Sequence, residues 1–240
     1  MASQTAARVS VTPSTHRCPH VFDHNILGLS NSFLWGCSRQ SALLPFFFQH
    51  LGAHSHLDVG VGSGFYLVQA VPLLERNETK LTLMDPHLSS LDAVQTHIHM
   101  AGFLGDIELI THNILLPMPG NIRNAPFDSI SLFHLFHSLP GGLANNASTV
   151  FSHLIPLLQQ DGTVYGAALL GKGVKHTFIG RILLRFWRWK GSVDVFEDDA
   201  EGLASALGEH FEHVNVRIEG SVALFVGRGP LNPSLISTSK

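Results

Sequence analysis

The sequence predicts an α/β fold with a doubly wound, mostly parallel sheet that helices cover on both faces. Two observations predict it. Apolar, β-prone runs alternate with helix-like segments along most of the 240 residues, and this alternation is typical of parallel sheets. One strand-like run, residues 56–61, also leads through three alternate glycines straight into a helix-like segment. A chain of this length can bury the core of one such domain.

The elements follow in chain order. The predicted strands cover residues 56–61, 80–85, 107–111, 127–135, 164–170, 214–218 and 223–227. The predicted helices cover residues 65–74, 88–100, 145–158, 177–189 and 198–210, after an irregular, aromatic-rich helical stretch over residues 22–51.

Three of these assignments have specific reasons. The run 127–135, with five apolar residues among nine, is interpreted as a strand buried on both faces. Gly162-Thr163 is expected to form a turn before the next strand. The last two strands flank Glu219-Gly220-Ser221 and are close enough to pair as an antiparallel C-terminal edge hairpin.

The chain divides into four predicted parts. Residues 1–18, rich in Ser, Thr and Ala, are expected to be a flexible tail. Residues 19–52 form an N-terminal helical lid segment and residues 53–229 form the main domain. Residues 230–240 are a second flexible tail.

Composition narrows the possible partners. A net charge of −3 with no basic stripe gives no nucleic-acid footprint. Cys18 and Cys37 fit no zinc pattern, and the 16 histidines are scattered, so we expect no metal site. The sequence shows neither a secretory signal nor an uninterrupted apolar run of transmembrane length, and we expect a cytoplasmic location.

The glycine-rich stretch carries the strongest functional signal. Gly60, Gly62 and Gly64 connect a strand to a helix, so that backbone N–H groups can approach a ligand closely. Asp85 ends the next strand about 20 residues later, the separation expected in a βαβ nucleotide site. Phe65 stands where the dinucleotide fingerprint needs its third glycine. Asp58, before the loop, suits a cofactor that carries an ammonium group.

The pattern Asp58-x-Gly60-x-Gly62-x-Gly64, followed by Asp85, resembles motif I and the ribose-binding acid of class I S-adenosylmethionine-dependent methyltransferases. The resemblance covers about residues 20–228 and implies a Rossmann-like sheet. It implies that the three glycines hold the methionine part of the cofactor. Asp58 would order this loop or meet the ammonium, and Asp85 would accept hydrogen bonds from both ribose hydroxyls.

Three further segments extend the resemblance. Asn113 follows the third strand where the family usually has an acid that binds the adenine amine, and an amide oxygen can accept the same bond. His134 and His137 lie in a stretch similar to motif IV. Residues 25–37 resemble the lid of a bacterial and fungal subgroup, with Phe22-Asp23 in place of its usual Tyr-Asp.

The two histidines are the catalytic candidates. The ordinary pKa of imidazole is about 6.5, so His137 could take a proton from a phenol or an enol. The alternatives for His137 are a cap on the following helix or a bond to a loop carbonyl. His134 is the second candidate for the base, and its alternative role is structural or toward the cofactor.

Residues 177–189 mix aromatic residues with Arg181, Arg185 and Arg188 at helical spacing. We expect an ordinary amphipathic helix packed on the sheet. A substrate cover is the second interpretation and a membrane-surface helix the third. The acids 197–199 are expected to cap the helix that follows.

The predicted function is S-adenosylmethionine-dependent methyl transfer to a small-molecule acceptor, with O-methylation of a secondary metabolite first. One alternative is a cyclase or isomerase that uses the bound sulfonium without transferring the methyl group. Another is a binding protein descended from a methyltransferase. A nicotinamide oxidoreductase is disfavoured by Phe65, and the oligomeric state stays open.

Overall fold

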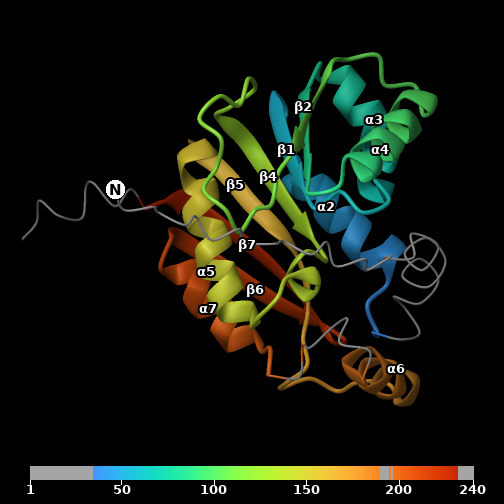
Figure 1. Ribbon diagram of the computed structural model, residues 1–240, viewed down its shortest axis with the longest axis vertical. Coiled ribbons are helices and arrows are strands. Elements are labelled where there is room, and N and C mark those ends of the chain that lie inside the picture. The colour runs from blue at the N-terminus through green and yellow to red at the C-terminus, as the bar shows by residue number, and fades with distance from the viewer. Residues whose placement is uncertain (1–34, 190–194, 196, 232–240) are drawn as a thin grey trace, which may run out of the picture.

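The computed structural model describes residues 35–189, 195 and 197–231, and these form one seven-stranded sheet (Figure 1). The strands are β1 (Ser55–Val59), β2 (Lys80–Asp85), β3 (Ile107–Thr111), β4 (Phe127–Phe133), β5 (Leu158–Leu169), β6 (Phe211–Glu219) and β7 (Val222–Pro230). Their spatial order is β3-β2-β1-β4-β5-β7-β6. The first five strands run parallel, and β7 pairs antiparallel with both β5 and β6. The predicted fold class and edge hairpin are confirmed.

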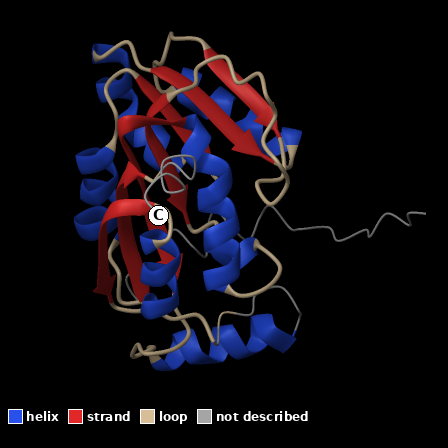
Figure 2. Cartoon of the chain, turned by 90° about the vertical axis from the view of Figure 1, so that its left-hand side faces the viewer, coloured by secondary structure: helices blue, strands red, loops and turns tan. Residues whose placement is uncertain are grey.

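Helices cover both faces of the sheet (Figure 2). The helical elements are η2 (Arg39–Leu43, a π-helix), α2 (Leu44–His50), α3 (Phe65–Arg76), α4 (Leu88–Met100), η3 (Phe136–Ser138), α5 (Leu143–Leu154), η4 (Ile155–Leu157), α6 (Phe178–Trp189) and α7 (Ala200–Gly208). Helices α2, α3 and α4 build one core cluster with Phe47, Leu67 and Leu91. Helices α5 and α7 build the other, with Phe151 and Leu203.

The sheet has a switch point between β1 and β4. From β1 the chain goes outward through β2 to β3, and it then returns to place β4 on the other side of β1. In open α/β sheets, ligands bind beyond the carboxyl ends of the strands at such a point. The fold therefore places the candidate site where β1, β2 and β4 end.

Two predicted boundaries are wrong. Gly162 and Thr163 do not form a separate turn, because both lie within β5, where Thr163 pairs with Ser129 and Arg228. Pairing on both sides overrides the local turn preference, and only a shift in the β4–β5 register marks this place. Strand β4 ends at Phe133, since His134 adopts a left-handed backbone conformation (φ 58°) that stops the strand.

The expected packing of α6 is confirmed only in part, since Leu184 is its one described residue in the core cluster that includes Leu169 and Val222. Leu184 is buried, but Phe178, Ile179 and Trp189 are 71%, 59% and 80% exposed. The reason is the position of the helix, which lies at one end of the molecule, apart from the helices that cover the sheet (Figure 1). Among the described residues, none of the helices has both the length and the apolar character that crossing a membrane requires.

The acidic run before α7 caps helices, as predicted, but it caps two of them. Asp199 Oδ1 accepts a hydrogen bond from the Gly202 N–H at 2.8 Å in the first turn of α7. Asp198 Oδ1 accepts one from the N–H of Leu143, the first residue of α5, at 2.8 Å. These acids thus join α5 to the start of α7.

Residues 19–34 of the predicted lid segment lie outside the described residues, as does the tail 1–18, so Cys18 and Phe22-Asp23 are not described. The described end of the lid segment is fixed to the last hairpin. The N–H and the Oγ of Ser221 both donate to the carbonyl oxygen of Trp35, at 2.7 Å and 3.1 Å. The helical stretch before the sheet is confirmed in part, by η2 and α2.

Candidate active site

The glycine loop between β1 and α3 has a conformation that glycine favours. Gly60, Gly62 and Gly64 have φ angles of 74°, 50° and 70°, all left-handed. Two of them are also packed closely. A Cβ on Gly60 would lie 2.7 Å from Leu135 Cδ1, and one on Gly64 would lie 2.6 Å from Val94 Cγ1. Helix α3 follows at once with no side-chain cap, so its first N–H groups are suited to a ligand.

Asp58 lies at the carboxyl end of β1, buried to 8% exposure. The β1–β4 register sets it beside Ser131, whose Oγ donates a hydrogen bond to Asp58 Oδ1. Burial raises the pKa of the Asp58 carboxyl to about 6; the Ser131 hydrogen bond opposes this shift, and the charge of Asp85 adds to it. No described residue makes a hydrogen bond to Asp58 Oδ2.

Asp85 lies on the neighbouring strand, at the end of β2, with the same exposure of 8%. Its Oδ1 accepts a hydrogen bond from the His87 N–H at 2.9 Å, which fixes the carboxylate on the turn into α4. Since its charge acts on Asp58, the two acids lie at one edge of the sheet. The structure therefore brings the glycine loop and both predicted acids together.

Asn113 lies two residues after β3 and is exposed. Its Oδ1 accepts a hydrogen bond from the Leu115 N–H at 3.0 Å, so the side chain is folded back on its own turn. An adenine amine would have to share this oxygen. The adenine contact of Asn113 stays a prediction.

His134 and His137 follow β4, with ring centroids 6.2 Å apart. The backbone N–H of His134 donates to the carbonyl oxygen of Ala167 on β5 at 2.8 Å, which holds its left-handed conformation. Burial lowers the pKa of His134 to about 3, and the charges of His137 and Arg39 lower it as well. The imidazole of His134 is therefore neutral and weakly basic near pH 7.

His137 belongs to η3 and is half-buried. The residue that precedes α5 is Gly142, so His137 is not the N-cap residue of that helix. His134 and His137 fall in the same intermediate class of exposure, so the choice of His137 as the base stays a prediction.

Several residues at this edge were missed by sequence reasoning. The guanidinium of Arg39 lies 4.4 Å from the centroid of the Phe65 ring, at the start of α3. No sequence pattern singles out this arginine. His56 and Ser131 contact the predicted acid Asp58 directly or through one another. The sequence pattern that could have identified them is the placement of polar residues at alternate positions of β1 and β4.

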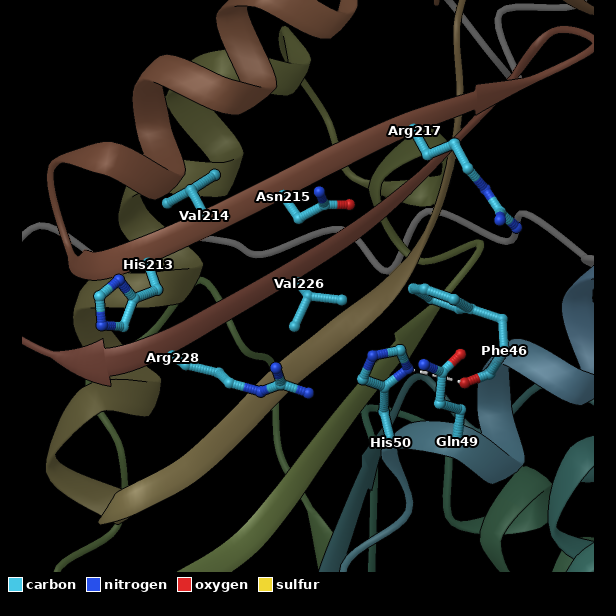
Figure 3. Close-up of a pocket in the computed structure, with 9 residues that line it drawn as sticks. All are labelled: Phe46, Gln49, His50, His213, Val214, Asn215, Arg217, Val226 and Arg228. Carbon is cyan, nitrogen blue, oxygen red and sulfur yellow. Dashed lines mark hydrogen bonds between the residues drawn. The ribbon is translucent and has the colours of Figure 1, made fainter.

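A separate cavity of about 340 Å³ lies between α2 and the edge strands β6 and β7 (Figure 3). Its polar lining includes His50, Arg217 and Arg228. Arg228 pairs with Thr163, near the amino-terminal side of the parallel sheet. This cavity is therefore distinct from the glycine loop. The described residues contain no group of three or more His, Cys, Asp or Glu side chains that could hold a metal ion.

Comparison with known proteins identifies the family. No protein-family model matches the chain. The chain is 36% identical over 211 residues to the Physcion biosynthesis cluster O-methyltransferase of Aspergillus chevalieri, covering 88% of this chain and 90% of that one. The chain belongs to the class I S-adenosylmethionine-dependent methyltransferases. This methyltransferase is also 40% identical over 203 residues to the uncharacterised protein YbcY of Escherichia coli (strain K12), covering 85% of this chain and 99% of that one.

Solved structures agree on the fold of this methyltransferase. An O-methyltransferase family protein from Burkholderia thailandensis matches with a TM-score of 0.57 at 19% identity, over 80% of this chain. The chain spans only 56% of that longer protein. The N-methyltransferase NodS of Bradyrhizobium japonicum WM9, in complex with S-adenosyl-L-homocysteine, matches with a TM-score of 0.54 at 15% identity, over 79% and 84% of the two chains. The predicted family, enzyme class and fold are confirmed.

Proposed function

We propose that this methyltransferase transfers a methyl group from S-adenosylmethionine to a hydroxyl oxygen of a small secondary metabolite. The observation that carries the proposal is the meeting of the glycine loop with two buried carboxylates at the sheet's switch point. The name of the Aspergillus chevalieri relative, an O-methyltransferase of a biosynthesis cluster, supports the oxygen acceptor and the class of substrate.

The residues at this edge fit S-adenosylmethionine. A loop with no space for Cβ atoms at Gly60 and Gly64 suits close backbone contact with the methionine part. The buried carboxylate of Asp58 suits the ammonium group, and Asp85 suits the ribose diol. When bound, this cofactor supplies a methyl group on a positively charged sulfur.

The protein's own contribution is positioning and proton transfer. His137 is proposed to take the proton of the acceptor hydroxyl on an imidazole nitrogen, which leaves the oxygen nucleophilic. His134, neutral through burial, would orient the acceptor without competing for this proton. Tyr66 and Phe133, with ring centroids 4.4 Å apart, provide apolar surface that helps to exclude water.

Two further assignments complete the proposal. Asn113 would contact the adenine through the oxygen that it already shares with the Leu115 N–H. A reducing compartment such as the cytoplasm suits the protein, since Cys37 is a buried free thiol.

The test is calorimetric titration of the full chain with S-adenosylmethionine, S-adenosylhomocysteine and NAD, followed by an acceptor screen read by product mass. We expect micromolar binding of the two sulfur compounds, no binding of NAD, and products heavier by one methylene. A product with the mass of its acceptor would overturn methyl transfer in favour of rearrangement. Absence of binding to both sulfur compounds would overturn the whole proposal.

A further inference from the structure

A chain of hydrogen bonds runs through the sheet interior and ends on Asp58. The Gly52 N–H donates to Ser129 Oγ at 2.7 Å, and Ser129 Oγ lies 2.7 Å from His56 Nδ1. His56 Nε2 lies 3.1 Å from Ser131 Oγ, which donates to Asp58 Oδ1. Ser129, His56 and Ser131 are all 0% exposed, so each polar group in the chain depends on its neighbours.

Both ends of this chain fix its direction. The Gly52 N–H can only donate, so Ser129 accepts there and its own hydrogen is left for His56 Nδ1. The Asp58 carboxylate can only accept, so Ser131 gives it its hydrogen and must itself accept from His56 Nε2. The hydrogen on Nε2 follows from the Ser131 end, and because burial lowers the pKa of His56 to about 3 the ring carries no second hydrogen, so Nδ1 accepts from Ser129.

The backbone holds this geometry. In the parallel register His56 is opposite Ser129 and Asp58 is opposite Ser131, so two adjacent strands set the spacing. Gly52 is needed at the far end, because a Cβ there would lie 2.8 Å from Ser129 Oγ. The arrangement is thus fixed by the sheet before any ligand arrives.

We propose that His56 is a positioning residue which, through Ser131, holds the Asp58 carboxylate ionised and aimed at the ammonium group of the cofactor. The inference rests on the proposed function, since it takes the ammonium as the partner of Asp58. A buried carboxylate with no donor tends to take a proton, and the hydrogen bond from Ser131 opposes this. A lysine or arginine in place of His56 would neutralise the carboxylate, whereas a neutral donor chain leaves its charge for the ligand.

The other groups that face Asp58 do not stabilise its ionised form. Asp85 on β2 is acidic and disfavours the ionised form. Tyr66 on α3 and Tyr165 on β5 are uncharged, because burial raises the pKa of each phenol above its usual range. Of the described groups whose effect on Asp58 is resolved, the hydrogen bond from Ser131 is the one that favours the carboxylate.

The test compares two ligands, S-adenosylhomocysteine and 5′-methylthioadenosine, which has the nucleoside and the sulfur but no amino acid. We expect Ser131→Ala to weaken binding of the first by about 10-fold or more and to leave the second almost unchanged. The loss of affinity for S-adenosylhomocysteine at low pH, caused by protonation of Asp58, should move to higher pH in this variant. Ser131→Thr keeps the hydroxyl and should restore both properties.

A matched control is Ser55→Ala, which removes a different buried hydroxyl, on β1, that donates to the Pro126 carbonyl oxygen rather than to Asp58. It should leave the ratio of the two affinities unchanged. An equal loss of affinity for both ligands in Ser131→Ala, or an unchanged pH midpoint of binding, would overturn the role of the hydrogen-bond chain while the proposed function stands. Wild-type protein that binds neither ligand would instead overturn the proposed function.

A measurement without ligand tests the chain by itself. The ¹⁵N NMR shifts of the His56 ring should show the Nε2–H tautomer in wild type and also in Ser129→Ala, where Ser131 still requires the hydrogen on Nε2. A protonated ring or an Nδ1–H tautomer in the wild type would overturn the inference. This result is also available if Ser131→Ala does not fold.

Discussion

Alanine substitutions at Gly62 and Gly64 distinguish two costs of a side chain in the glycine loop. One is strain of the left-handed backbone, and the other is a steric clash of the new Cβ. Gly62 and Gly64 both have left-handed backbones, with φ of 50° and 70°, and an alanine there costs about 1–2 kcal/mol of backbone strain. A Cβ on Gly62 would meet nothing closer than Gly60 O at 4.0 Å. A Cβ on Gly64 would lie 2.6 Å from Val94 Cγ1 and 3.1 Å from its Cγ2.

The magnitudes follow from this difference. Val94 is 1% exposed on α4, so it has little space to move, and overpacking of this kind costs roughly 1–3 kcal/mol. We expect Gly62→Ala to lower the free energy of unfolding by about 1–2 kcal/mol and Gly64→Ala to lower it by about 2–5 kcal/mol. Urea denaturation of the two variants beside wild type measures both values.

A double variant identifies the clash. Val94→Ala removes the methyl groups that the new Cβ would meet, so Gly64→Ala with Val94→Ala should be more stable than the sum of the single effects predicts, by about 1–3 kcal/mol. Gly62→Ala with Val94→Ala should be additive. Equal losses in the two glycine variants, or additivity in both pairs, would refute the steric argument.

Three other substitutions test the site. Asp85→Ala should weaken S-adenosylmethionine binding by about 10–100-fold, since a diol loses a charged acceptor; calorimetry showing wild-type affinity would remove Asp85 from the site. His137→Ala should lower kcat by roughly 10²–10⁴-fold with nearly unchanged cofactor affinity, and wild-type turnover would exclude it as the base. Asp58→Asn should stabilise the fold at pH 7.5. The pKa of the folded carboxyl is about 6 against 3.8, so its ionisation costs stability above pH 6 and not below about pH 4. The gain in the free energy of unfolding should be roughly 2–3 kcal/mol at pH 7.5 and should disappear at pH 4, and an equal gain at both values would contradict this account.

Sequence patterns correctly predicted the features whose geometry is set by residues close together in the chain. The glycine loop, the strand-end acids and the cap at Asp199 each follow from neighbours in the chain, and each lies where it was expected. The closing hairpin could be predicted for the same reason, because a short turn joins its strands.

What the sequence could not provide depends on contacts between distant segments. Gly162 is extended because β5 pairs with its neighbours, although glycine by itself favours a turn. The position of α6 depends on where the chain leaves β5. The donor chain to Asp58 exists only in the register of β1 with β4, more than 70 residues apart, for example 73 between Asp58 and Ser131. Arg39 reaches the site from a π-helix that no pattern marks.

The contact between Trp35 and Ser221 has a consequence for synthesis of the chain. Its partners are 186 residues apart, and Ser221 belongs to the turn between the last two strands. During translation, Trp35 can meet its partner only after Ser221 has left the ribosome, and contacts of such long sequence separation slow folding. A chain shortened at its C-terminus would therefore lose an anchor near the other end of the described structure.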